Sequence, residues 1–117
     1  MSANLQGTIK NVTVTTDGTT VTCTPSTVLV TNPNTLVVFN LTTSGYNFPA
    51  TSAVVVNTPN TDFPYASWTV KPQQAAIFDS KVVNGDYEYT CTVVETSSGH
   101  VLSVDPVIRN GNPTTGP

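Results

Sequence analysis

Cys91 and His100 are the two residues of this chain whose types could perform catalysis together. A thiol acts as a nucleophile when a base within hydrogen-bond reach takes its proton and a third group orients that base. Nine positions separate the two residues, and on one hairpin with alternating faces they could be neighbours. A cysteine in an apolar strand is usually inert, however. We therefore expect no enzyme and no catalytic residue, with a cysteine-histidine enzyme as a remote alternative.

Cys23 is the other cysteine of the chain, and it leaves two interpretations open. A disulfide between Cys23 and Cys91 would remove loop-closure entropy from the unfolded chain and contribute about 3 to 4 kcal/mol. Alternatively, both residues are buried thiols that serve as small apolar groups. The start Met1–Asn4 lacks the cationic residues and apolar run of a secretory signal, which favours thiols and a cytoplasmic location. Secretion with the leader removed is the alternative location.

The acidic residues and the single histidine show no spacing typical of a metal site or an acid-base pair. A calcium loop needs carboxylates at fixed intervals, and general acid-base catalysis needs an identifiable pair of groups. We therefore expect no cofactor and no metal. His100 is expected to be a hydrogen-bonded strand residue, with a pH-sensitive surface group as the alternative.

Only 9% of the 117 residues carry a charge, and the net charge is −3. Because no basic stripe is present to neutralise phosphates, nucleic acid is not expected as a partner. Apolar runs such as Val28–Val30 and Leu36–Phe39 are far shorter than the roughly 20 residues of a membrane span. The length suits one domain, which we assign to residues 1–110, with a flexible tail at 111–117.

Apolar and polar residues alternate along much of the chain, which is the pattern of half-buried strands. In the stretch from Gly85 to Val93, for example, Tyr87, Tyr89 and Cys91 point to one face. No stretch has the apolar period of a helix. The predicted strands cover residues 8–16, 19–23, 27–31, 35–41, 53–56, 66–70, 74–83, 86–93 and 100–104, with an extension at 107–108. Short strands with frequent turns predict an all-β antiparallel Greek-key β-sandwich.

Two turns containing glycine should set the strand register. Asp17-Gly18 lies between two alternating runs and suits a two-residue type I′ turn, in which both central residues have φ > 0. Asn84-Gly85 carries the strongest short-range hairpin signal, so the strands on either side of it should pair directly. A third hairpin is expected around residues 96–99.

The strand at residues 35–41 is apolar on both faces, because Leu36 and Val38 supplement the alternate residues. Strands buried on both faces read as nearly continuous apolar runs. The pattern therefore predicts a strand that is central to its sheet and covered on both sides.

Aromatic residues cluster along the loosely patterned crossover that follows this strand. They are Tyr46, Phe48, Phe63, Tyr65 and Trp68. One interpretation is a platform for a sugar or a protein loop, with Tyr46, Tyr65, Trp68 and His100 as candidate ligand-binding residues. The other interpretation is that the aromatic side chains cap the open end of the sandwich core.

The pattern Gly-x-Tyr-x-Tyr-x-Cys from Gly85 to Cys91 resembles the cupredoxin strand that delivers the copper-binding cysteine. Residues 25–40 are similar to the early strand pair of that family, and Tyr46 falls where the family carries a histidine. The resemblance implies a cupredoxin-like fold. A blue-copper site needs two imidazoles, a thiolate and an axial ligand such as Met. Since His100 is the only histidine, the resemblance implies the fold without the copper.

Two other resemblances are weaker. Tyr89 resembles the tyrosine corner of immunoglobulin-like sandwiches, with Cys23 and Cys91 as the inter-sheet pair, but Trp68 lies too far along the chain for that family. The segment 104–110 is similar to the small bacterial DP-EP family, which would bring no function with it.

These observations favour a non-enzymatic module that acts through its surface, in protein interaction or self-assembly. Such a module should present a flat strand edge or an exposed apolar patch. The alternative is a ligand-binding or carbohydrate-binding domain that uses the aromatic crossover.

Overall fold

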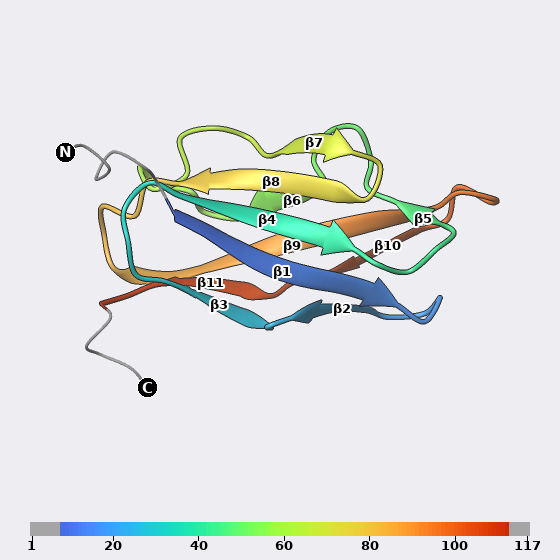
Figure 1. Ribbon diagram of the computed structural model, residues 1–117, viewed down its shortest axis with the longest axis horizontal. Helices are drawn as coiled ribbons and strands as arrows, with labels where there is room; N and C mark the ends of the chain where they lie inside the picture. Colours follow the sequence, from blue (N-terminus) through green and yellow to red (C-terminus); the bar gives the residue numbers. More distant parts are fainter. Residues whose placement is uncertain (1–7, 113–117) are drawn as a thin grey trace.

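The computed structural model describes residues 8–112, in which two β-sheets pack face to face as a sandwich (Figure 1). The described elements are all strands: β1 (Thr8–Thr16), β2 (Val21–Thr24), β3 (Thr27–Val30), β4 (Thr35–Leu41), β5 (Tyr46–Asn47), β6 (Val54–Val56), β7 (Trp68–Lys71), β8 (Gln74–Asp79), β9 (Gly85–Glu95), β10 (Val101–Val104) and β11 (Val107–Asn110). The all-β sandwich predicted from the alternation is confirmed. The tail expected at 111–117 falls largely outside the described residues, although the Gly111 amide donates to the Val30 carbonyl.

The five-stranded sheet has the order β2-β1-β4-β8-β7, and the second sheet has the order β10-β9-β11-β3, with β5 and β6 also paired to β9. Two pairings, β1 with β4 and β3 with β11, run parallel. The sheets are therefore mixed rather than purely antiparallel. The reason is the path of the chain, which crosses to the second sheet between β2 and β3 and returns in β4 beside β1.

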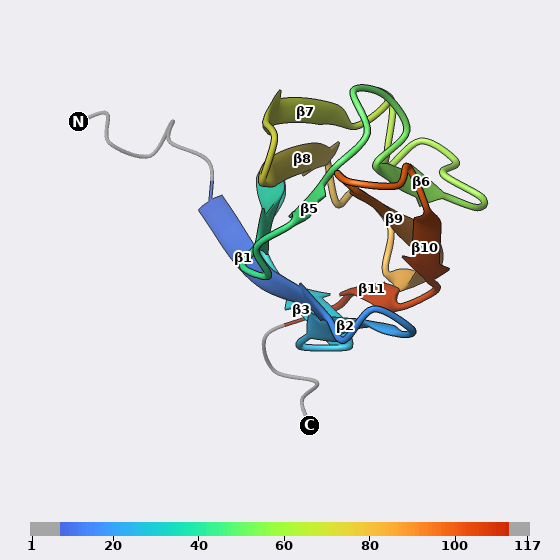
Figure 2. The same ribbon diagram turned by 90° about the vertical axis from the view of Figure 1, so that its right-hand side faces the viewer.

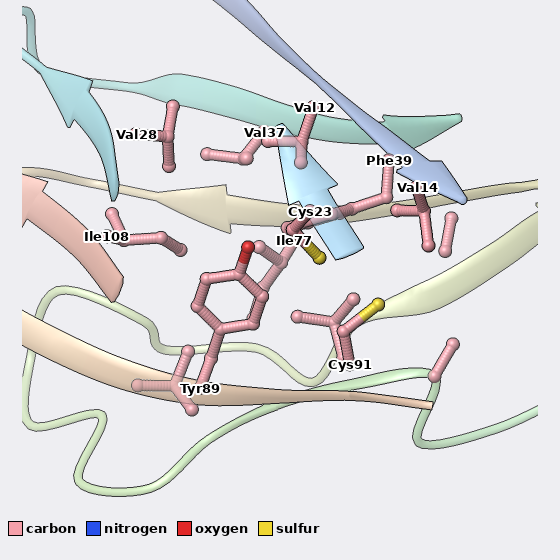
Figure 3. Packing of buried hydrophobic residues seen from close by; sticks show 14 of the residues in the cluster. Val12, Val14, Cys23, Val28, Val37, Phe39, Ile77, Tyr89, Cys91 and Ile108 are labelled. Carbon is pink, nitrogen blue, oxygen red and sulfur yellow. The ribbon is translucent and has the colours of Figure 1, made fainter. Parts of the chain in front are cut away.

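The core lies between the sheets and is built from the alternate residues of the long strands. Val37, Phe39 and Leu41 of β4 face Tyr89 and its neighbours on β9, with the rings of Phe39 and Tyr89 in edge-to-face contact at 5.4 Å. Figure 3 shows side chains from both sheets meeting in this layer. The period-2 pattern therefore predicted the inner faces of the principal strands correctly.

The hairpin between β1 and β2 forms where the sequence predicts it, but its turn differs. Thr16 pairs with Val21, which leaves a four-residue loop, and of Asp17 and Gly18 only Gly18 has positive φ, at 93°. The Asp17 carboxylate accepts hydrogen bonds of 2.8 Å from the backbone amides of Thr19 and Thr20. This side-chain turn replaces the expected type I′ geometry.

Asn84-Gly85 does not form a hairpin, which corrects the prediction. The strand before it, β8, ends at Asp79 in the five-stranded sheet, whereas β9 belongs to the other sheet. The Asp62 carboxylate holds the backbone amides of Val82 and Val83, so the segment between the strands is fixed as a crossover. A tertiary contact has overridden a local turn signal.

The last two strands follow the prediction closely. The β10 strand pairs antiparallel with β9 as a hairpin, and β11 continues along the same edge of β9 after the interruption at Pro106. The Tyr89 amide donates to the Pro106 carbonyl at 3.0 Å and bridges the interruption. As a result β9 has neighbours along most of both edges.

Candidate interaction face

Residues that lie opposite one another on paired strands project from the same face of a sheet. On the outer face of the five-stranded sheet, Ile9 of β1 lies opposite Leu36 of β4, and Leu36 lies opposite Phe78 of β8. The ring of Tyr65, just before β7, contacts the ring of Phe78 at a centroid distance of 6.1 Å. These four side chains form one apolar row across the sheet.

A second row runs beside the first. Val38 of β4 lies opposite Ala76 of β8, and Ala76 lies opposite Trp68 of β7. On the other side, Val38 lies opposite the polar Asn11 of β1, so the row is apolar across β4, β8 and β7. We call the combined set the outer-face patch: Ile9, Leu36, Val38, Tyr65, Trp68, Ala76 and Phe78.

The residues at the ends of the two rows of the outer-face patch are exposed to solvent. Tyr65 is 66% exposed, Ile9 62% and Trp68 44%. Leu36, Val38 and Phe78 are half-buried, and Ala76 is buried beneath its neighbours. In Figure 2 no strand or loop among residues 8–112 lies over this face of the sheet. None of its members carries a charge.

A ladder of amide side chains borders the patch. Asn40 donates to Asn11 at 3.2 Å, and Gln74 donates to Asn40 at 3.0 Å, so three adjacent strands are linked across their outer face. These amides satisfy one another in the plane of the sheet. The face therefore changes from apolar to polar along a defined line.

The prediction for the strand at residues 35–41 was right in one respect and wrong in another. As β4 it is central, lying between β1 and β8. Its second face, bearing Leu36 and Val38, is however covered by no described element, and both side chains are only half-buried. A continuous apolar run specifies two apolar faces but not what covers each of them.

The structure separates the aromatic residues of the crossover. Phe48 and Phe63 are buried in the core and Tyr46 packs against it, as the capping interpretation expected. Tyr65 and Trp68 instead lie on the outer face. The four candidate ligand-binding residues are not brought together. Tyr46 lies near the Gly18 turn, and His100 is exposed in the loop just before β10.

Tyr65 also borders a cavity of about 300 Å³ that opens between β6 and the segment at residues 59–67 that leads to β7. Its walls are mostly apolar and include Val54, Phe63, Pro64 and Ile77. Trp68, Tyr46 and His100 do not line it. The cavity is thus a small apolar slot next to the outer-face patch.

Cys91 and His100 are not placed for joint chemistry. Cys91 is fully buried and lies opposite Val104, whereas His100 is exposed in the loop that joins β9 to β10. Cys23 is buried as well, and neither cysteine forms a disulfide in this structure. The two cysteine side chains point into the same part of the core from opposite sheets (Figure 3).

A buried polar cluster, which the sequence did not predict, closes the end of the core near the segment that joins β8 to β9. The Asp62 carboxylate accepts hydrogen bonds from the Tyr87 hydroxyl at 3.1 Å and from the Asn110 amide at 2.9 Å. Burial works to raise the pKa of Asp62, but these hydrogen bonds and those from the Val82 and Val83 amides outweigh it and leave the pKa lowered. Asp62 is a structural carboxylate that organises its surroundings.

No three or more His, Cys, Asp or Glu side chains gather as a metal site among residues 8–112. In the same region no helix is long and apolar enough to cross a membrane. No protein-family model and no curated protein sequence matches the chain. The outer-face patch is therefore the most prominent candidate site on the described surface, and its function is inferred from its own geometry.

Proposed function

We propose that this protein is a non-enzymatic, cupredoxin-like β-sandwich that acts as an assembly module, and that the outer-face patch is the surface through which copies associate. The proposal rests on one observation: strand pairing aligns two rows of apolar side chains on a sheet face that no described element covers. Large exposed apolar patches usually mark protein-protein contacts, because covering them removes apolar area from water.

The site lies on one face of a sheet, which suits another sheet as the partner. Sheets pack face to face at about 10 Å through interdigitating side chains. Two parallel rows of Ile, Leu, Val, Phe, Tyr and Trp side chains provide ridges and grooves for such packing. The edge strand β7, which carries Trp68, places the largest of these side chains at the border of the sheet.

The distribution of charge favours a second copy as the partner. The patch itself is uncharged, and the exposed acids Asp86 and Glu88 lie on β9 in the opposite sheet. Two copies can therefore meet through their patches while these acids point away from the contact. The net charge of −3 then adds little repulsion at the interface.

The test is sedimentation velocity over a wide concentration range. The wild-type chain should form dimers or larger species as concentration rises, and the double variant Ile9→Thr, Trp68→Thr should remain monomeric. The variant Val101→Thr is the matched control, since Val101 is 57% exposed on β10 of the other sheet. A wild-type chain that stays monomeric at the highest concentration would contradict assembly through this face.

A second candidate function rests on the cavity beside Tyr65. Its volume of about 300 Å³ is at the lower end of the range for small-molecule sites and suits one aromatic ring or sugar. Titration of the protein with indole and with a panel of monosaccharides, followed by calorimetry, tests this function. Ala66→Leu, which narrows the cavity, should abolish any binding heat, and Val101→Leu should leave it unchanged.

A further inference from the structure

Cys23 and Cys91 are the only two cysteines of the chain, and they face each other from opposite sheets. Cys23 lies on β2 and Cys91 on β9. In Figure 3 both sulfur atoms point into the same part of the core, toward one another. A pair of facing thiols 68 positions apart in the chain is a specific arrangement, since either could have pointed to solvent after a one-residue shift of register.

We propose that Cys23 and Cys91 form a redox-active dithiol, which closes to a disulfide that joins the two sheets. Both sulfur atoms already point into the same part of the core, toward one another, before any bond forms (Figure 3). Closure then joins two side chains that the sheets hold face to face. The product would be a covalent link through the centre of the sandwich.

The two thiols have different access to solvent, which assigns their order of reaction. Cys23 is 5% exposed and lies on β2, a four-residue strand at the edge of its sheet. Cys91 is fully buried on β9, which has strands on both edges. Short edge strands open locally more readily than central ones. Cys23 is therefore the thiol that an oxidant reaches first.

The electrostatics agree with this order. The neighbouring Cys91 thiol lowers the pKa of Cys23, whereas the neighbouring Cys23 thiol and burial raise the pKa of Cys91. Since the thiolate is the reactive form, these directions agree with Cys23, the more accessible thiol, as the nucleophile. Cys91 is then the resolving thiol.

The oxidant in this scheme is a small-molecule disulfide such as oxidised glutathione. The Cys23 thiolate attacks one sulfur of that disulfide, forming a mixed disulfide and releasing one thiolate. Cys91 loses its proton to solvent and attacks the sulfur of Cys23, which releases the second small thiol. Two protein thiols are oxidised to one disulfide, and one small disulfide is reduced to two thiols.

The test uses the full chain in its folded state. The protein is incubated with oxidised glutathione, quenched with acid, unfolded, alkylated and weighed by mass spectrometry. We expect a monomeric product that has lost two hydrogen atoms, takes up no alkylating agent, melts at higher temperature and reverts fully with dithiothreitol. Recovery of two free thiols, or of a stable glutathione adduct in the wild-type chain, would overturn the proposal.

Single variants test the order of attack. Cys91→Ala should stop at a glutathione adduct on Cys23, because the resolving thiol is missing. Cys23→Ala should give little adduct under the same conditions, since Cys91 is fully buried. Equal adduct formation in both variants would contradict the assigned order. Far-ultraviolet circular dichroism before treatment establishes that each variant is folded, and Cys→Ser versions serve if either Ala variant is not.

Discussion

Asp79 accepts a 2.9 Å hydrogen bond from the side-chain amide of Asn110 in the buried end of the core. The same amide donates to Asp62, also at 2.9 Å, so one nitrogen bridges two carboxylates. Four other donors are divided unequally between the two acids: the Val82 and Val83 amides and the Tyr87 hydroxyl donate to Asp62, and the Lys81 amide donates to Asp79. Asp62 is surrounded by donors, whereas the second oxygen of Asp79 accepts no hydrogen bond from any residue between 8 and 112. The two acids should therefore respond to the same substitution in opposite ways.

Asp79→Asn should stabilise the protein at neutral pH. Burial raises the pKa of Asp79 to about 6, so the folded state binds this proton more tightly than the unfolded state does. Stability from this group is present below pH 4 and is lost as pH rises through 6, at a cost of about 3 kcal/mol. Urea unfolding between pH 4 and 8 should show this loss in the wild type and a flatter profile in the variant. Identical pH profiles would contradict the assignment.

Asp62→Asn should destabilise the protein at the same pH. The amide group of the variant would point a donor at the Tyr87 hydroxyl, the Asn110 amide or the backbone amides of Val82 and Val83, all of which donate to Asp62 in the native protein. Leaving buried donors without an acceptor costs about 2 to 4 kcal/mol here. Urea unfolding of the wild type and the variant at pH 7.5 measures this loss of stability. A neutral or stabilising effect would show that the Asp62 carboxylate does not hold the segment between β8 and β9 in place.

Arg109→Ala should change the free energy of unfolding only slightly, because exposed ion pairs contribute little. Arg109 and Asp86 form an ion pair at 2.8 Å, but both side chains are more than half exposed. Solvent and salt screen such a pair, in contrast to the buried acids. Thermal melts at low and high sodium chloride should show a small difference that shrinks with salt. A loss comparable to that of Asp62→Asn would be inconsistent with an exposed pair.

Self-association through the outer-face patch should resist sodium chloride and strengthen in ammonium sulfate. The patch contains no charged residue, so screening removes little attraction, while sulfate strengthens the burial of apolar surface. Sedimentation in the two salts at matched ionic strength distinguishes this from a contact between charges. Dissociation by sodium chloride alone would point to another surface.

The sequence predicted the fold more fully than the site. Alternation located β1 and β4 to the residue and identified the inner face of β9, because burial of one sheet face imposes a period of two. It could not predict that Asn84-Gly85 joins two sheets, since the decisive contact is the distant Asp62 carboxylate.

The candidate site shows the same limit. Leu36, Val38, Tyr65 and Trp68 were all recognisable as apolar residues, and the sequence suggested burial for the first two and a ligand for the others. Only the register of β4, β8 and β7 shows that they share one uncovered face. Pairing between strands distant in the chain is a property of the fold, and a local pattern does not contain it.

The position of β9 has a consequence for how the molecule opens. From Glu88 to Glu95 this strand has β10 or β11 on one edge and β5 or β6 on the other, and the amides of Tyr89 and Thr92 bond across the gaps between those neighbours. Its amides donate to neighbours on both edges, so exchange of the whole strand with deuterium requires release of the strands on both sides. The backbone of β9 should therefore exchange at the rate of global unfolding, well after the amides of β2 and β7.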